Sequence, residues 1–139
     1  MTWLLDTNIL SELRNKSPNP SVIEWITHHL NETSYLSVIT IGELKAGISR
    51  LPSSKRRTNL QAWLEKDILQ TYQSRILPID TETMLIWGEL MAKLTGIGKP
   101  MPIVDSLIAS TARQHNLTLV TRNVADFQAV DISVINPWD

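Results

Sequence analysis

Four acidic residues are placed where they could act together in catalysis. Asp6 follows the apolar run "WLL", Glu43 and Asp105 lie in the first turns of predicted helices, and Asp126 follows the strand-like "NLTLVT". In an open α/β sheet, ligands bind outside the carboxyl ends of the strands. We therefore expect the four carboxylates to meet above the carboxyl edge of one sheet.

Such a cluster would require cations or protons. At about 5 Å and an effective dielectric constant near 20, each pair of like charges costs roughly 3 kcal/mol. Oxygen ligands alone suit Mg²⁺ or Mn²⁺, whereas zinc favours imidazole. His28, His29 and His115 lie outside the acidic motifs and are expected on helix surfaces. The acids therefore indicate a hard divalent cation.

Three of the acids also have a purely structural interpretation. Asp6 could cap the helix predicted from "ILSELR". Glu43 follows Thr40 by three residues, the spacing of a capping box in which the two side chains bind free N–H groups. Asp126 could complement the dipole of a short helical turn. Taken singly, Asp6 and Asp126 are better explained as caps, whereas for Glu43 the capping role and a role in the site are equally well supported.

Asp105 is the acid that favours function most. It shares the predicted apolar stripe of its helix with Ile108, while Ser106, Ser110 and Arg113 are assigned to the solvent-facing side. A carboxylate that faces inward is costly unless it is hydrogen-bonded, paired or bound to a metal.

The elements that must position these acids alternate between strand and helix. Apolar periodicity and turn residues predict strands over 2–5, 34–40, 75–80, 116–121 and 132–137, and helices over 9–14, 21–30, 40–51, 58–72, 84–94, 102–115 and 123–127. This order favours a three-layer α/β/α sandwich with a central, mainly parallel sheet.

Composition restricts the class of protein. A chain of 139 residues suits one domain, over 1–139. Because it has no cysteine, thiol nucleophiles, thiolate zinc sites and disulfides are excluded, and the cytoplasm is the default location. No apolar run has the roughly 20 residues that span a bilayer, so no membrane association is expected.

The charges are distributed unevenly along the chain. The formal net charge of −1 argues against a general nucleic-acid coat. The most basic stretch ends in Lys55, Arg56 and Arg57, just before a predicted helix, where positive charge opposes the helix dipole. A solvated loop is one explanation, and contact with the phosphates of a nucleic acid is the other.

Four segments of the chain together resemble a known family. "LLDTNIL", "TIGELKAGI", "PIVDSLIAS" and "LVTRNVADF" are similar to the successive acidic motifs of PIN domains, in particular the VapC-type toxin ribonucleases of bacterial toxin–antitoxin pairs. The resemblance covers nearly the whole chain and implies a single PIN domain.

The resemblance implies metal-assisted hydrolysis of RNA with Mg²⁺ or Mn²⁺. Asp6 and Asp105 are expected to bind the metal, Glu43 to orient or deprotonate water, and Asp126 to complete the metal site. Asn8, Thr121 and Asn123 are expected to support the site and contact the substrate. The alternative is a non-catalytic PIN-like module that binds RNA or protein, with the acids serving as caps.

The same resemblance implies three partners: an RNA substrate, a second copy of the chain, and an antitoxin whose carboxyl-terminal tail blocks the acidic pocket. A basic side chain of the antitoxin would suit that pocket. Trp25, Trp63 and Trp87 lie in predicted amphipathic helices, where they are expected to pack in the core. Apolar side chains that remain outside a small core typically mark interfaces. The residues leave open which RNA is cleaved.

Overall fold

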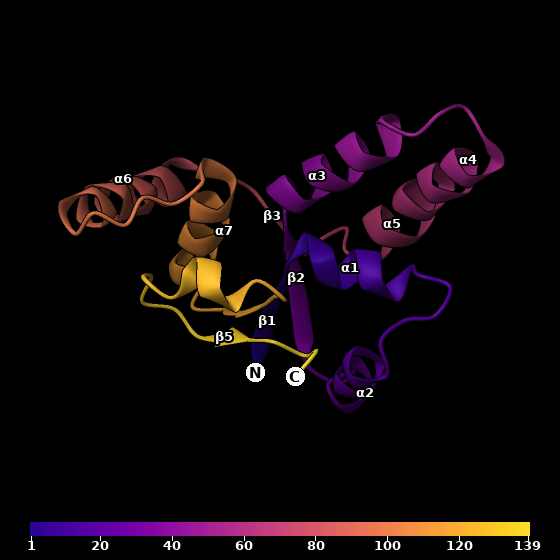
Figure 1. Cartoon of the computed structure of the whole chain (residues 1–139), viewed down its shortest axis with the longest axis horizontal. Coiled ribbons are helices and arrows are strands. Elements are labelled where there is room, and N and C mark those ends of the chain that lie inside the picture. Colours follow the sequence, from indigo (N-terminus) through magenta and orange to yellow (C-terminus); the bar gives the residue numbers. More distant parts are fainter.

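A computed structural model describes residues 1–139 and confirms an alternating α/β chain (Figure 1). The elements are β1 (Thr2–Leu5), α1 (Thr7–Leu13), α2 (Pro20–His28), β2 (Thr33–Ser37), α3 (Val38–Ser49), α4 (Lys55–Ala62), the π-helix η1 (Trp63–Ile68), α5 (Leu69–Thr71), β3 (Ile76–Leu77), α6 (Thr81–Gly96), α7 (Ile103–Gln114), β4 (Thr118–Val120), the 3₁₀-helix η2 (Val124–Phe127) and β5 (Val134–Ile135). None of these helices combines the length and the hydropathy that spanning a bilayer requires.

The sheet has five strands in the order β3-β2-β1-β4-β5, and every pair is parallel. The chain runs outward from β1 to β3 and then returns to the other side of β1 for β4. This reversal makes the boundary between β1 and β4 a topological switch point, where the loops after the two strands diverge and leave a crevice. The expected site is therefore beside β1.

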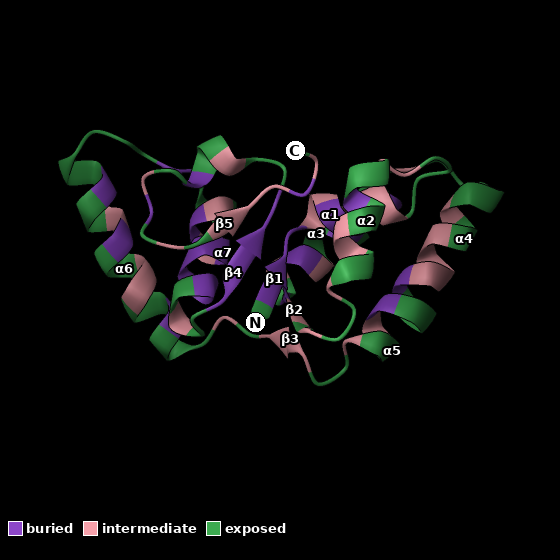
Figure 2. Ribbon diagram, turned by 90° about the horizontal axis from the view of Figure 1, so that it is seen from below, coloured by how far each residue is buried: buried purple, intermediate pink, exposed green.

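Side chains of the central strand alternate between two cores. Leu4 packs with residues of α6 and α7, whereas Trp3 and Leu5 pack with residues of α1, α3 and η1 on the other face. Figure 1 shows α6 and α7 on the opposite side of the sheet from α1, α2, α4 and α5. In Figure 2, β1 and β4 are almost entirely buried. The predicted three-layer α/β/α architecture is confirmed.

The boundary between β2 and α3 differs from the prediction. The strand predicted over 34–40 ends at Ser37, whose hydroxyl accepts a hydrogen bond from the Ile39 N–H (3.0 Å) and caps α3. Thr40 is instead a fully buried residue within the helix, and its hydroxyl has no partner. The capping box predicted between Thr40 and Glu43 is therefore wrong, so Glu43 is released from that structural role.

The predicted solvent-facing side of α7 is also wrong in part. Ser106 and Ser110 are buried, and their hydroxyl groups find hydrogen-bond partners close by. Ser106 accepts a hydrogen bond from the Trp87 indole (2.8 Å) and donates to the Ile103 carbonyl (2.6 Å), and Ser110 donates to the Ser106 carbonyl (2.7 Å). A small hydroxyl satisfied within its own helix can be buried at little cost.

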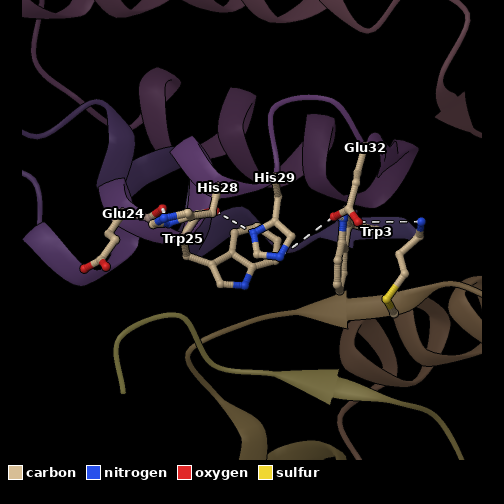
Figure 3. Close-up of polar contacts among 7 residues, drawn as sticks. Trp3, Glu24, Trp25, His28, His29 and Glu32 are labelled. Carbon is tan, nitrogen blue, oxygen red and sulfur yellow. Dashed lines mark hydrogen bonds and ion pairs between the residues drawn. The ribbon is translucent and has the colours of Figure 1, made fainter.

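Trp3 is surrounded by polar and aromatic groups at the amino end of the sheet (Figure 3). Its indole donates to the Glu32 carboxylate (2.8 Å), which also lies 3.7 Å from the terminal amine of Met1. His29 stacks on Trp25 with ring centroids 4.2 Å apart. This cluster fixes the start of β1. His28 and His115 are exposed, as predicted, but His29 is half-buried, because its ring stacks on Trp25.

Candidate active site

Asp6 is the first polar residue after β1 and is 6% exposed. It caps α1, because its Oδ1 accepts a hydrogen bond from the Thr7 N–H (2.8 Å). Burial raises the pKa of Asp6 above its usual value, and the charges of Glu43 and Asp126 raise it further, whereas the hydrogen bonds from Thr121 and Thr7 lower it. Capping and a role in a site are therefore compatible at this residue.

Thr121 joins the ends of β1 and β4. Its hydroxyl donates to the free Oδ2 of Asp6 (2.8 Å) and accepts from the Asn8 amide (3.2 Å) and the Asn123 N–H (3.1 Å). The Asn8 side-chain oxygen accepts in turn from the N–H of Arg122 (3.3 Å). Asn8, Thr121 and Asn123 thus form one network that orients the Asp6 carboxylate and the loop after β4.

Glu43 reaches the same place from α3. The Thr7 hydroxyl donates to Glu43 Oε1 (2.7 Å), which leaves Oε2 without a hydrogen bond. Because Thr7 is also the first residue of α1 and binds Asp6 through its N–H, it links the two acids. Glu43 itself is exposed to solvent.

Asp6, Glu43 and Asp105 line one cavity of about 450 Å³, here called the acidic cavity. Asp105 lies in the first turn of α7 and is half-buried. Desolvation raises the pKa of Asp105 above its usual value, and the negative charges of Asp6, Asp126 and Glu43 raise it further. The four predicted acids are therefore near enough to repel one another, even though they come from distant parts of the sequence.

The other predicted residues differ in their position relative to the acidic cavity. Asn8 and Asn123 line the acidic cavity, and Thr121 lies buried behind Asp6. Asp126 is exposed at the edge, acting on Asp6 and Asp105 through its charge without lining the cavity. The basic residues Lys55, Arg56 and Arg57 lie on α4, outside the acidic cavity.

Sequence reasoning missed several residues of the acidic cavity. Glu12 adds a further carboxylate, and Arg122 is the only basic side chain in its lining. Trp138, almost at the carboxyl terminus, donates its indole N–H to Glu12 Oε1 (3.2 Å) and lies under the Arg122 guanidinium (5.3 Å). Glu12 could have been found from its position four residues after Asn8, on the same face of α1, but no local pattern indicates the contact with Trp138.

The acidic cavity provides ligands of the type that a hard divalent cation requires. Its acids offer carboxylate oxygens only, and burial raises the pKa of Asp6 and Asp105, with a further contribution from the negative charge of the neighbouring acids. No three of its acidic side chains are arranged closely enough to coordinate one ion in their present orientations. The donor chemistry therefore fits Mg²⁺ or Mn²⁺, and binding one ion requires the less buried acids to turn toward Asp6, whose two oxygens are already held by hydrogen bonds.

The fold and the acidic cavity define a class of protein, and comparison with known proteins agrees. The family model of the PIN domain matches residues 3–132, so the chain belongs to the PIN-domain family.

Two relatives extend over almost the whole chain. One is "VapC ribonuclease Y4jK" of Sinorhizobium fredii, 39% identical over 98% of this chain and 97% of that protein. Another is "Toxin FitB" of Neisseria gonorrhoeae, 39% identical over 97% of both chains. A crystal structure of FitAcB from Neisseria gonorrhoeae superposes with a TM-score of 0.92, at 39% identity and covering 98% of each chain. The predicted VapC-type PIN domain is confirmed.

Repulsion among the acids yields a prediction about stability. In metal-free buffer at pH 7.5, Asp105→Asn should raise the free energy of unfolding by up to about 1 kcal/mol, because it removes a charge that burial and its neighbours disfavour. A group whose pKa is raised by folding destabilises the folded state while it is ionised. The gain should therefore disappear as the pH falls through the raised pKa of Asp105.

Urea unfolding in EDTA at several pH values measures this difference. Asp67→Asn is the matched control, because Asp67 is exposed on η1 and lies outside the acidic cavity. A destabilised Asp105→Asn protein, or a gain of the same size in Asp67→Asn, would contradict the account.

Proposed function

We propose that the protein is a Mg²⁺-dependent endoribonuclease that acts as the toxin of a toxin–antitoxin pair. The observation that carries the proposal is the acidic cavity at the topological switch point, where Asp6, Glu43 and Asp105 come from separate elements. The names of the VapC ribonuclease and FitB toxin relatives support the substrate class and the biological role.

Asp6 and Asp105 are the residues that would hold Mg²⁺, with Mn²⁺ as a substitute, and Asp126 would assist from the edge of the cavity. When bound, Mg²⁺ supplies Lewis-acid polarisation of the phosphodiester and acidifies the attacking water. Thr121 holds Asp6 Oδ2, and Thr7 holds Asp6 Oδ1. The Asp6 side chain is thereby fixed before any ligand arrives.

Glu43 is suited to accept the proton of the attacking water. The hydrogen bond from Thr7 to Oε1 orients the carboxylate and leaves Oε2 available for that proton. Asn8 and Asn123 line the same cavity and offer amide groups to the substrate. Phosphates away from the cleaved bond would contact Lys55 and Arg56, and Arg57 extends this basic strip on α4.

Two protein partners belong to the proposal. The similar FitAcB structure, whose name adds a second component to that of the toxin FitB, supports a protein partner, and we assign an antitoxin to that role. Exposed apolar residues on α6 and at the start of α7, namely Met84, Leu85, Ile103 and Val104, support a homodimer, because such residues typically mark interfaces. The toxin, its antitoxin and the RNA substrate would meet in the cytoplasm, which is the predicted location.

Loss of either central carboxylate should abolish catalysis. Asp6→Asn and Asp105→Asn should each reduce Mg²⁺-dependent cleavage of total cellular RNA by at least 100-fold while keeping the native circular dichroism spectrum, because both remove negative charge from the metal site. Mapping the products of the wild type would also identify the RNA. Asp67→Asn is the control, and full activity in either site variant would disprove the assignment.

Co-expression tests the toxin role. Production of the chain alone should arrest growth, and production with the protein encoded by the neighbouring gene should restore growth and yield a complex heavier than either chain. Light scattering gives the mass of the complex and of the free chain. The toxin role would be contradicted by a chain that remains monomeric, does not slow growth and forms no complex with the protein of the neighbouring gene. The assignment as a PIN nuclease would remain.

A further inference from the structure

A larger cavity of about 970 Å³ opens beside the acidic cavity, between α1, α3 and α4. We call it the basic groove, because four cations line it and Glu43 is its only acid; these cations are Arg14, Lys16, Lys55 and Arg56. Figure 1 shows the three helices together on one side of the sheet. The groove has a charge opposite to that of the cavity beside it.

The basic groove continues directly into the acidic cavity. Thr7, Ser11, Asn15 and Glu43 line both. A chain of phosphates lying in the groove would therefore lead to the carboxylates, and the cations along its path would offset the phosphate charge. Arg57, although next to Arg56 in the sequence, does not line the groove.

Trp63 gives the basic groove a flat aromatic wall. It is the first residue of the π-helix η1, and it packs against the core on one side while remaining half-exposed. Leu64 and Ile68 of the same π-helix are buried, which anchors this wall. The Arg14 guanidinium lies 6.0 Å from the centre of the Trp63 ring.

The distance between Arg14 and Trp63 is close to that needed to hold a nucleobase. A base stacked between two flat groups needs about two van der Waals separations, about 7 Å. Arg14 is exposed on a flexible side chain, so a movement of about 1 Å would admit the base. Aromatic rings and arginine both stack on bases without strong sequence preference.

On the basis of the proposed nuclease function, we infer that the basic groove binds a single-stranded segment of the RNA next to the cleaved bond. One base stacks between Trp63 and Arg14, and Lys16, Lys55 and Arg56 contact the phosphates. In a duplex the faces of the bases are covered by their neighbours, so the aromatic wall favours a single strand. Trp63 is thus a substrate-binding residue.

The test measures RNA binding in EDTA, where cleavage does not occur. Fluorescence anisotropy should show that the wild type binds a labelled 12-nucleotide single strand more tightly than a duplex of the same sequence. Trp63→Leu should weaken single-strand binding about 5- to 100-fold, and Trp63→Phe should weaken it less, because a ring is retained. Arg14→Gln combined with Lys16→Gln should lower the magnitude of the salt slope by about 0.7, because Lys16 is the one phosphate contact that this variant removes.

Arg113→Gln is the matched charge control, because Arg113 is exposed on α7 and does not line the groove. Circular dichroism checks the fold of Trp63→Leu, and the Arg14→Gln/Lys16→Gln variant, which changes only exposed side chains, tests the groove independently. Equal binding of single strand and duplex would overturn the inference. So would RNA affinity that is unchanged in both the Trp63→Leu and Arg14→Gln/Lys16→Gln variants.

The outcome is independent of the proposed nuclease activity, since binding in EDTA requires no catalysis. Cleavage that persists in Asp105→Asn would contradict the catalytic assignment but leave the groove result standing. Unchanged RNA affinity in Trp63→Leu, together with loss of binding to the co-expressed partner protein, would assign the groove to a protein segment instead and overturn the inference.

Discussion

The hydrogen bond from Thr121 to Asp6 joins the carboxyl ends of β1 and β4, and the candidate site depends on it. A carboxylate that is 6% exposed must be compensated, or its burial would favour the neutral form. Thr121 and the Thr7 N–H compensate part of this cost, and the pKa of Asp6 nevertheless remains raised. The fold thus holds negative charge at the switch point at the expense of stability, which is typical of functional sites.

The hydrogen bonds of Thr121 and Thr7 position several segments of the chain around Asp6. Thr121 also binds Asn8 and the Asn123 N–H, so α1 and the loop after β4 are positioned by the same hydroxyl. Thr7 links Asp6 to Glu43 of α3. Next to this acidic cavity, the basic groove has the opposite charge. The two together suit a polyanion whose phosphates are bound by cations along one stretch and meet carboxylates at a single point.

Short-range sequence patterns predicted the alternating fold and the meeting of Asp6, Glu43 and Asp105. Asp6 and Asp105 lie at element ends that apolar periodicity reveals, whereas Glu43 lies in the middle of α3, because that helix begins at Val38. The same patterns failed where one stretch of sequence suits both a strand and a helix. The β-branched run 38–40 suits a strand, but capping by Ser37 starts α3 there. The contact between Trp138 and Glu12 spans 126 residues, and only the folded chain brings them together.

The most direct test of the central claim is a calorimetric titration of the metal-free protein with Mn²⁺ in the absence of RNA, at pH 7.5. The wild type should bind Mn²⁺ saturably. Thr121→Val should bind about 10- to 100-fold more weakly, because Oδ2 of Asp6 is no longer held, and Asp6→Asn should lose the binding. The absence of saturable binding in the wild type, or equal binding by Asp6→Asn, would contradict a metal site built on these carboxylates.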